Sequence, residues 1–182
     1  ASPPRRASPS RATATPAKQE CRAAVVDRLG NVYALNGNAA ITKYNSEGTE
    51  LWTFNVPVQD EAHVCRAFRI DALDRIYVGV SEGGSQLTAR LWCYQPDDDT
   101  KLSAFWVKLI TPKMFVEDIQ IREDKLYAAM SSPESGRGYL VVYEHVTTSV
   151  PEEAWRRSIP YPVNCLDVNA KDDSVRSRIK FF

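Results

Sequence analysis

The stretch VVDRLGNVYAL, residues 25–35, reads as an apolar strand, a tight polar turn and a second strand that carries a tyrosine. Similar stretches follow at FRIDALDRIYVGV (68–80), IQIREDKLYAAM (119–130) and CLDVNAKDDSV (165–175). The equivalent apolar positions are 44, 51 and 47 residues apart, at Val26, Ile70, Ile121 and Val168. Four short strands with their turns have about this length. The period therefore predicts the blades of a β-propeller.

The second half of each copy runs from a tyrosine, through a polar turn, to a tryptophan. The three examples are KYNSEGTELW (43–52), WCYQPDDDTKLSAFW (92–106) and VYEHVTTSVPEEAW (142–155), with Tyr-to-Trp distances of 8, 12 and 12 residues. Aromatic side chains that return once per blade favour packing between neighbouring sheets, with an aromatic ligand cage as the alternative. We expect Trp52, Trp106 and Trp155 to be largely buried at equivalent positions.

The first turn opens with Asp27 and closes with Gly30, which suits a tight hairpin because Asp bonds backbone amides and Gly tolerates positive φ. Glycine is absent from the corresponding segments 71–75 and 122–125. We expect hairpins there too, with a different turn type. Helix signals are almost absent, and EEAWRRS (152–158) is expected to be a strand.

These patterns predict an all-β chain that forms a β-propeller segment of about three and a half four-stranded antiparallel blades. Residues 1–21, rich in Pro, Ser, Ala and Arg, are expected to be a disordered tail or linker, and residues 22–182 a partial propeller. The expected blades span about 22–58, 63–110 and 115–160, with a half blade at 163–182. Because a half blade leaves a sheet edge open, we expect a piece of a larger propeller, completed by further blades of the same or another chain.

Composition limits the classes of function. The 182 residues are 43% hydrophobic and 25% charged, with a net charge of zero, and no apolar run approaches the roughly 18 residues of a membrane helix. Residues 1–22 carry five Lys or Arg and one Glu, so the rest of the chain is mildly acidic. An acidic body argues against a nucleic-acid groove.

Metal, cofactor and catalytic signatures are weak. The chain has four cysteines, which are Cys21, Cys65, Cys93 and Cys165. They form no CxxC pair and have no His at ligand spacing, so a zinc site is not expected. The sequence is compatible both with buried free thiols and with disulfides. The run Asp97–Asp99 is expected to be a solvated turn rather than a calcium site. His63 and His145 have no nucleophile motif nearby, and the loops 82–85 and 134–138 precede no helix that would cradle a phosphate. We expect no catalytic residue, cofactor or metal.

The motifs DRLGNVYALNGN (27–38) and AITKYNSEGTELWTF (40–54) resemble bacterial β-propeller repeats of the SBBP and PQQ-like types. Their copies run Asp-x-x-Gly-Asn-Val-Tyr and later Lys-Tyr-Asn/Asp-x-x-Gly-x-x-x-Trp, and the resemblance covers residues 23 to about 175. It implies structural roles: Asp27, Gly30 and Gly48 would shape turns, while Tyr33, Tyr44 and Trp52 would pack blades. The later copies would repeat these roles at Asp71, Tyr77, Tyr94, Trp106, Tyr127, Tyr143 and Trp155.

The resemblance also guides the functional hypothesis. PQQ-dependent dehydrogenases share the propeller, but this chain lacks their adjacent Cys pair, their regular Ala-x-Asp-x-x-Thr-Gly-Lys run and an identifiable base. We therefore expect a non-catalytic scaffold of WD40-like architecture that binds a protein or another ligand. The alternative is the propeller portion of an enzyme, PQQ-like or carbohydrate-active, whose active residues lie elsewhere. By resemblance, the location would be periplasmic or extracellular.

Overall fold

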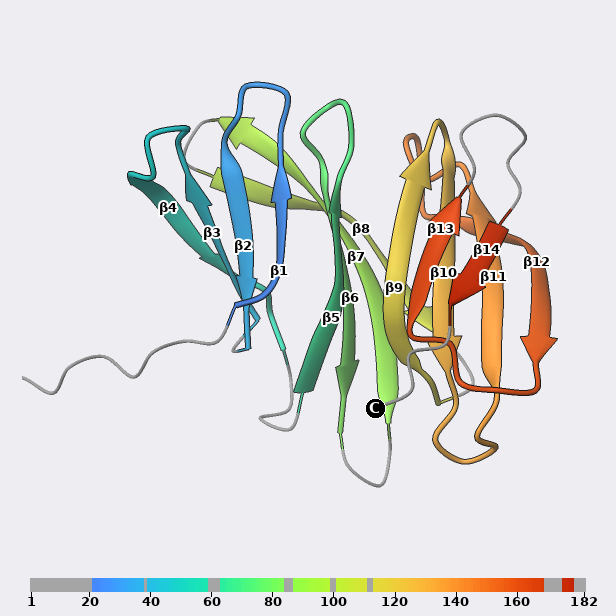
Figure 1. Ribbon diagram of the computed structural model, residues 1–182. Coiled ribbons are helices and arrows are strands. Elements are labelled where there is room, and N and C mark those ends of the chain that lie inside the picture. The colour runs from blue at the N-terminus through green and yellow to red at the C-terminus, as the bar shows by residue number, and fades with distance from the viewer. Residues whose placement is uncertain are drawn as a thin grey trace, which may run out of the picture.

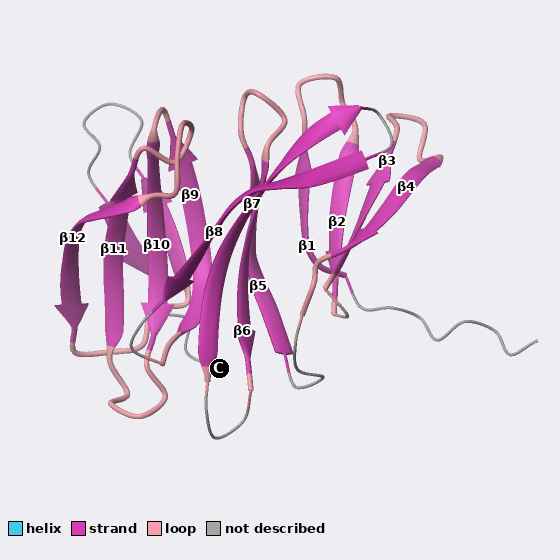
Figure 2. Ribbon diagram, turned by 180° about the vertical axis from the view of Figure 1, so that it is seen from behind, coloured by secondary structure: helices cyan, strands magenta, loops and turns pink. Residues whose placement is uncertain are grey.

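The chain folds into antiparallel β-sheets. The computed structural model describes residues 21–37, 39–58, 63–83, 87–98, 101–110, 113–168 and 175–178, and within them every regular element is a strand (Figure 2). Sheet 1 contains β1 (Cys21–Val26), β2 (Val32–Asn36), β3 (Ala40–Tyr44) and β4 (Glu50–Asn55). Sheet 2 contains β5 (His63–Ile70), β6 (Ile76–Glu82), β7 (Thr88–Asp98) and β8 (Lys101–Ile110). Sheet 3 contains β9 (Phe115–Arg122), β10 (Lys125–Ser131), β11 (Gly138–Glu144) and β12 (Glu152–Ile159), and sheet 4 contains β13 (Cys165–Val168) and β14 (Val175–Arg178).

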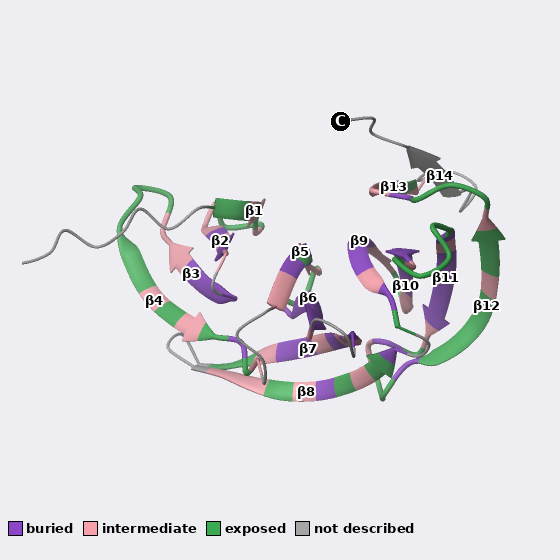
Figure 3. Ribbon diagram, turned by 90° about the horizontal axis from the view of Figure 1, so that it is seen from below, coloured by how far each residue is buried: buried purple, intermediate pink, exposed green. Residues whose placement is uncertain are grey.

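Within each sheet the strands are paired in chain order, as in a meander. The sheets fan out along an arc, with β1, β5, β9 and β13 on its inner side and β4, β8 and β12 along its outer rim (Figure 3). The expected all-β fold of three four-stranded sheets and a two-stranded one is confirmed, and so is the strand at 152–158. Of the expected tail, residues 1–21, the first twenty lie outside the described residues, and Cys21 begins β1.

The first hairpins of sheets 1 and 2 use the same turn. Oδ1 of Asp27 accepts hydrogen bonds from the amides of Leu29 and Asn31, at 2.9 and 2.8 Å, and Gly30 has a φ of 82°. Oδ1 of Asp71 likewise accepts from the amides of residues 73 and 75, at 2.8 and 3.0 Å. Asp74 takes the place of Gly30 with a φ of 60°. The expected change of turn type at 71–75 is wrong, because Asp is among the few residues that enter the left-handed region at modest cost.

The first hairpin of sheet 3 does differ. Arg122 pairs directly with Lys125, so only two residues form the turn, and Glu123 has a φ of 53°. Asp124 accepts hydrogen bonds from the amide of Thr147, at 2.8 Å, and from its hydroxyl. The carboxylate therefore joins this hairpin to the β11–β12 turn instead of closing its own turn.

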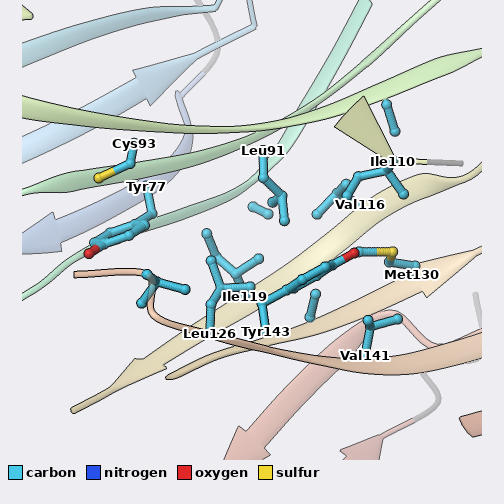
Figure 4. Close-up of a cluster of buried hydrophobic side chains, with 14 of the residues drawn as sticks. Tyr77, Leu91, Cys93, Ile110, Val116, Ile119, Leu126, Met130, Val141 and Tyr143 are labelled. Carbon is cyan, nitrogen blue, oxygen red and sulfur yellow. The ribbon is translucent and has the colours of Figure 1, made fainter. Parts of the chain in front are cut away.

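Apolar side chains fill the space between successive sheets. The cluster between sheets 1 and 2 includes Tyr33, Leu35 and Ile41 against Phe68 and Tyr94. The larger cluster between sheets 2 and 3 is shown in Figure 4 and includes Tyr77, Leu91, Ile119, Leu126 and Tyr143. A smaller cluster joins sheets 3 and 4 through Tyr127, Leu140, Val142, Val163 and Leu166. Burial between sheets supplies the main stabilisation of such stacked repeats.

The backbone of β6 approaches β9 closely at Gly79. A Cβ atom added there would lie 2.5 Å from Cγ1 of Val116 and 2.8 Å from Cβ of Ala67. Real Cβ atoms do not approach other atoms so closely. Glycine at this position therefore lets sheets 2 and 3 pack tightly.

Trp155 contradicts the expectation of three buried tryptophans. Trp106 is only 4% exposed and Trp52 is half-buried, whereas Trp155 is 44% exposed. The described strands of sheet 4 explain the difference, because β13 contacts the inner strands β9 and β10 and leaves the rim strand β12 uncovered (Figure 3). The equivalent position is thus buried only where a neighbouring sheet extends to the rim.

Candidate binding face

The hairpins β1–β2, β5–β6 and β9–β10 all lie at one end of the sheets, the upper end in Figure 1. The β3–β4 and β11–β12 turns lie at the same end. We call the surface formed by residues 27–31, 45–49, 71–75, 122–125 and 145–149 the hairpin face. Turns and loops on a rigid scaffold are where binding residues concentrate.

Two exposed leucines mark equivalent positions on the hairpin face. Leu29 is 79% exposed and Leu73 is 67% exposed. Each stands two residues after the aspartate that organises its turn, so the shared turn geometry presents both side chains to solvent. A single surface leucine needs no explanation. Here the same turn position exposes a leucine in two successive hairpins, so apolar surface recurs on the hairpin face.

A groove of about 280 Å³ runs between sheets 1 and 2 on this face, and we call it groove 1. Apolar and charged side chains share its lining, which consists of Asp27, Leu29, Tyr33, Lys43, Trp52, Asp74, Pro96 and Leu102. The β1–β2 hairpin and β3–β4 form one wall, and the β5–β6 and β7–β8 ends form the other. Groove 1 therefore offers adjacent apolar surface and charge to a ligand.

The sheet 1 wall of groove 1 is preorganised. The rings of Tyr33 and Trp52 meet edge to face, with centroids 5.9 Å apart, and Nζ of Lys43 lies 5.1 Å from the Tyr33 centroid. Oδ2 of Asp27 accepts bonds from the Asn31 side chain, at 2.8 Å, and from the Tyr33 hydroxyl, at 3.3 Å. Partial burial pushes the pKa of Asp27 upward, but the bonds from Asn31 and Leu29 and the charge of Lys43 outweigh it and lower the pKa below its usual 3.8. The carboxylate of Asp27 is therefore occupied by hydrogen bonds that fix the turn and the position of the Tyr33 ring.

Asp74, on the opposite wall, is different. Its carboxylate makes no hydrogen bond or ion pair with the described residues, although its backbone amide donates to the Asp71 carbonyl at 3.2 Å. Its positive φ stands where sheet 1 has a glycine. Asp74 is thus the carboxylate that groove 1 offers to a ligand.

A second groove, of about 370 Å³, lies between sheets 2 and 3, and we call it groove 2. Its most polar lining groups already bond one another: the Arg75 side chain donates to Oδ2 of Asp71, at 2.7 Å, and to the carbonyl of Thr147, at 2.6 Å. The hydroxyl of Tyr77 also donates to Oδ2 of Asp71, at 3.0 Å. Arg75 therefore links sheets 2 and 3 through its hydrogen bond to the carbonyl of Thr147. Groove 2 also retains a carboxylate, that of Glu123, that makes no hydrogen bond or ion pair with the described residues.

Ion pairs line the inner strands. Arg66 of β5 pairs with the buried Glu117 of β9, and Arg69 donates to Oδ1 of Asp118 at 2.8 Å. The amide of Leu166, in sheet 4, donates to Oδ2 of Asp118 at 2.9 Å. A cavity of about 140 Å³ at the end remote from the hairpin face is lined by Arg22, Gly37, His63, Val64, Cys65 and Arg66. These contacts join sheets and have a structural role.

The other candidate residues from the sequence lie apart from one another. Oδ1 of Asp97 accepts a hydrogen bond from the Ser103 hydroxyl at 2.7 Å, whereas Asp99 lies outside the described residues. Nδ1 of His145 is 3.4 Å from Oδ2 of Asp124 in the exposed β11–β12 turn, and His63 begins β5. All four cysteines are free thiols. Among the described residues no three His, Cys, Asp or Glu side chains converge on a metal position, and no helix is long and apolar enough to cross a membrane.

The predicted repeat residues occupy defined places in the packing. Tyr33, Tyr77, Tyr94, Tyr127 and Tyr143 are buried in the clusters between sheets. Gly48 has a φ of 83° in the β3–β4 turn, where Asn45 accepts amide bonds as Asp27 does. Tyr44 is half-buried at the end of β3. Sequence reasoning missed Asp74 and the two exposed leucines; the spacing Asp-x-Leu, common to 27–29 and 71–73, was the available signal.

Comparisons with known proteins give the fold and no more. No protein-family model and no curated protein sequence matches this chain. A solved structure of the Dos1 propeller aligns with a TM-score of 0.51 and 15% identity, covering 74% of this chain and 36% of that chain. BamB from Moraxella catarrhalis aligns with a TM-score of 0.37 and 12% identity, covering 74% of this chain and 50% of that one. The chain thus spans about a third of the Dos1 propeller chain, and its stacked sheets are blades of a β-propeller.

Proposed function

We propose that this chain is a non-catalytic β-propeller scaffold that binds an extended segment of a partner protein on its hairpin face. The observation that carries the proposal is groove 1, where the exposed Leu29, the half-buried Trp52 and the carboxylate of Asp74 lie together. A rigid groove with an aromatic residue and a few placed polar groups suits recognition of a peptide.

The finer identification from the repeats belongs to the same proposal. The motif residues Asp27, Tyr44 and Trp52 support a bacterial propeller of the SBBP or PQQ-like type, and a periplasmic or extracellular location is proposed from that resemblance alone. Most titratable side chains in the two grooves bond to turns or to neighbouring sheets, as Asp27, Asp71 and Arg75 do. Side chains held in such hydrogen bonds are less available for proton transfer.

A peptide library tests the proposal without a known partner. A displayed library of random 12-residue peptides is selected against the parent chain and against the double variant Leu29→Asp/Leu73→Asp. We expect the parent to enrich a consensus that the double variant does not retain. Leu109→Asp is the matched control, because Leu109 is 54% exposed on the rim strand β8, away from the hairpin face. Enrichment of the same peptides by the parent and the double variant would refute the hairpin face as the binding surface.

A further inference from the structure

We propose that groove 1 binds an extended segment in which proline adjoins arginine, and that its occupant in this protein is the chain's own Pro3-Pro4-Arg5-Arg6. The inference rests on the proposed function because it uses the same face. It adds the chemistry of the ligand, and it makes residues 3–6 of the chain a competitor of the partner segment for groove 1. Three features of the chain support it: the apolar lining, the carboxylate of Asp74 and the composition of residues 1–20.

The apolar lining of groove 1 fits a polyproline-type ligand. Leu29, Trp52, Pro96 and Leu102 contribute side chains from both walls. Proline-rich segments bind grooves lined by aromatic residues because their extended helix is already formed, so little conformational entropy is lost on binding. Trp52 is fixed by its contact with Tyr33, so the ring presents a rigid surface.

The charge of groove 1 fits an arginine next to that proline. Asp27 and Asp74 contribute two carboxylates, against the one ammonium group of Lys43. Asp27 is held by its own turn, whereas Asp74 has no partner among the described residues. A guanidinium can pair with a carboxylate and stack on the face of a neighbouring tryptophan. An arginine of the ligand that lies beside Asp74 and Trp52 could make the ion pair with Asp74 and the stacking contact with Trp52.

The N-terminal residues carry this chemistry. Five of residues 1–22 are Lys or Arg and one is Glu, and the prolines meet the arginines at residues 3–6. Cys21 begins β1, whose six residues span about 20 Å before the hairpin face. The fourteen residues 7–20 reach up to about 46 Å when extended, so Pro3 to Arg6 can reach groove 1 of the same chain or of a second copy.

A labelled peptide tests the proposal on the full chain. The probe is a fluorescein-labelled peptide of residues 1–12, and the receptor is the 182-residue chain carrying Arg5→Glu and Arg6→Glu, so that its own tail does not compete. We expect saturable binding by fluorescence anisotropy. Adding Asp74→Asn to that receptor should weaken binding about three- to fivefold, as expected for a partly exposed charge pair. Asn retains the tolerance for positive φ, so the turn should persist.

The matched control is Glu123→Gln in the same receptor. Glu123 is also a carboxylate at positive φ without a partner among the described residues, but it lines groove 2. Its loss should leave peptide binding unchanged. Equal weakening by the two variants would mean that general attraction to an acidic face explains the binding, and the assignment to groove 1 would be lost.

The parent chain identifies the occupant. A tethered tail is present at an effective concentration on the order of millimolar, so a peptide with Kd on the order of 0.1 mM should bind the parent about tenfold more weakly than the Arg5→Glu/Arg6→Glu chain. Equal affinity for the two chains would overturn the tail as occupant. Sedimentation velocity assigns the source: a monomeric parent means docking within the chain, and a dimer that the tail variant dissociates means docking between copies. If the peptide fails but the library consensus still binds, this inference fails and the scaffold proposal stands.

Discussion

The indole N–H of Trp106 donates a hydrogen bond of 2.8 Å to the backbone carbonyl of Val146, forty residues later in the chain. Trp106 belongs to β8 on the rim of sheet 2, and Val146 to the β11–β12 turn of sheet 3. The same indole lies 5.9 Å from the ring of Tyr77. The third-to-fourth strand turn of one sheet thus covers the tryptophan of the preceding sheet.

We expect Trp106→Ala to lower the free energy of unfolding by about 3 to 5 kcal/mol, because it removes a buried ring and leaves a cavity. Trp155→Ala should cost well under half of that, since Trp155 is 44% exposed. Urea denaturation of both variants checks the difference. Closely similar midpoints would contradict the described cover over Trp106.

We expect Gly79→Ala to destabilise the chain by about 1 to 3 kcal/mol, because its methyl group would overlap Val116 and Ala67. Val116→Ala in the same chain should recover part of the loss by opening space. A double-mutant cycle from denaturation midpoints measures this coupling. Strictly additive losses would show that Gly79 and Val116 are not in contact.

Asp27→Asn should remove part of the pH dependence of stability. The folded state lowers the pKa of Asp27 below 3.8, so its ionised form contributes stability above the unfolded-state pKa and loses it as the pH falls through the folded value. Thermal unfolding between pH 6 and pH 3 should show the parent more stable near neutrality, with the two curves converging below about pH 4. A constant gap across that range would exclude the ionised carboxylate as the cause.

The cysteines should differ sharply in reactivity. Burial, aided by the charge of Glu82, raises the pKa of Cys65 to about 12, and burial raises that of Cys93 to about 12. Cys21 is exposed. Iodoacetamide at pH 8 should therefore modify Cys21 in the native chain and reach Cys65 and Cys93 only after denaturation, as peptide mass spectrometry can show. Rapid native labelling of Cys93 would indicate that sheets 2 and 3 open readily.

Local patterns predicted the strands well, because alternation of apolar residues and the spacing of Tyr and Trp reflect the period of a paired strand. They failed where the outcome depends on a neighbour. Trp155 stands at the same 12-residue distance from its tyrosine as Trp106, and the sheet beside each tryptophan decides its burial. The turn type predicted for 71–75 is wrong because Asp74 replaces a glycine without changing the geometry of the turn. Groove 1 joins residues of two sheets, and no spacing within one copy could indicate it.

Two hydrogen bonds that Asp118 accepts from neighbouring sheets bear on how the chain unfolds. Stacked repeats usually behave as a line of units in which each senses only its immediate neighbours. Asp118 of sheet 3 accepts hydrogen bonds from Arg69 of sheet 2 and from Leu166 of sheet 4, so one carboxylate couples three units. Detachment of sheet 4 exposes that carboxylate and changes its contact with Arg69. Unfolding that begins at β13 and β14 should therefore also weaken the next junction, between sheets 2 and 3, which makes the loss of structure more nearly all-or-none than pairwise stacking alone would give.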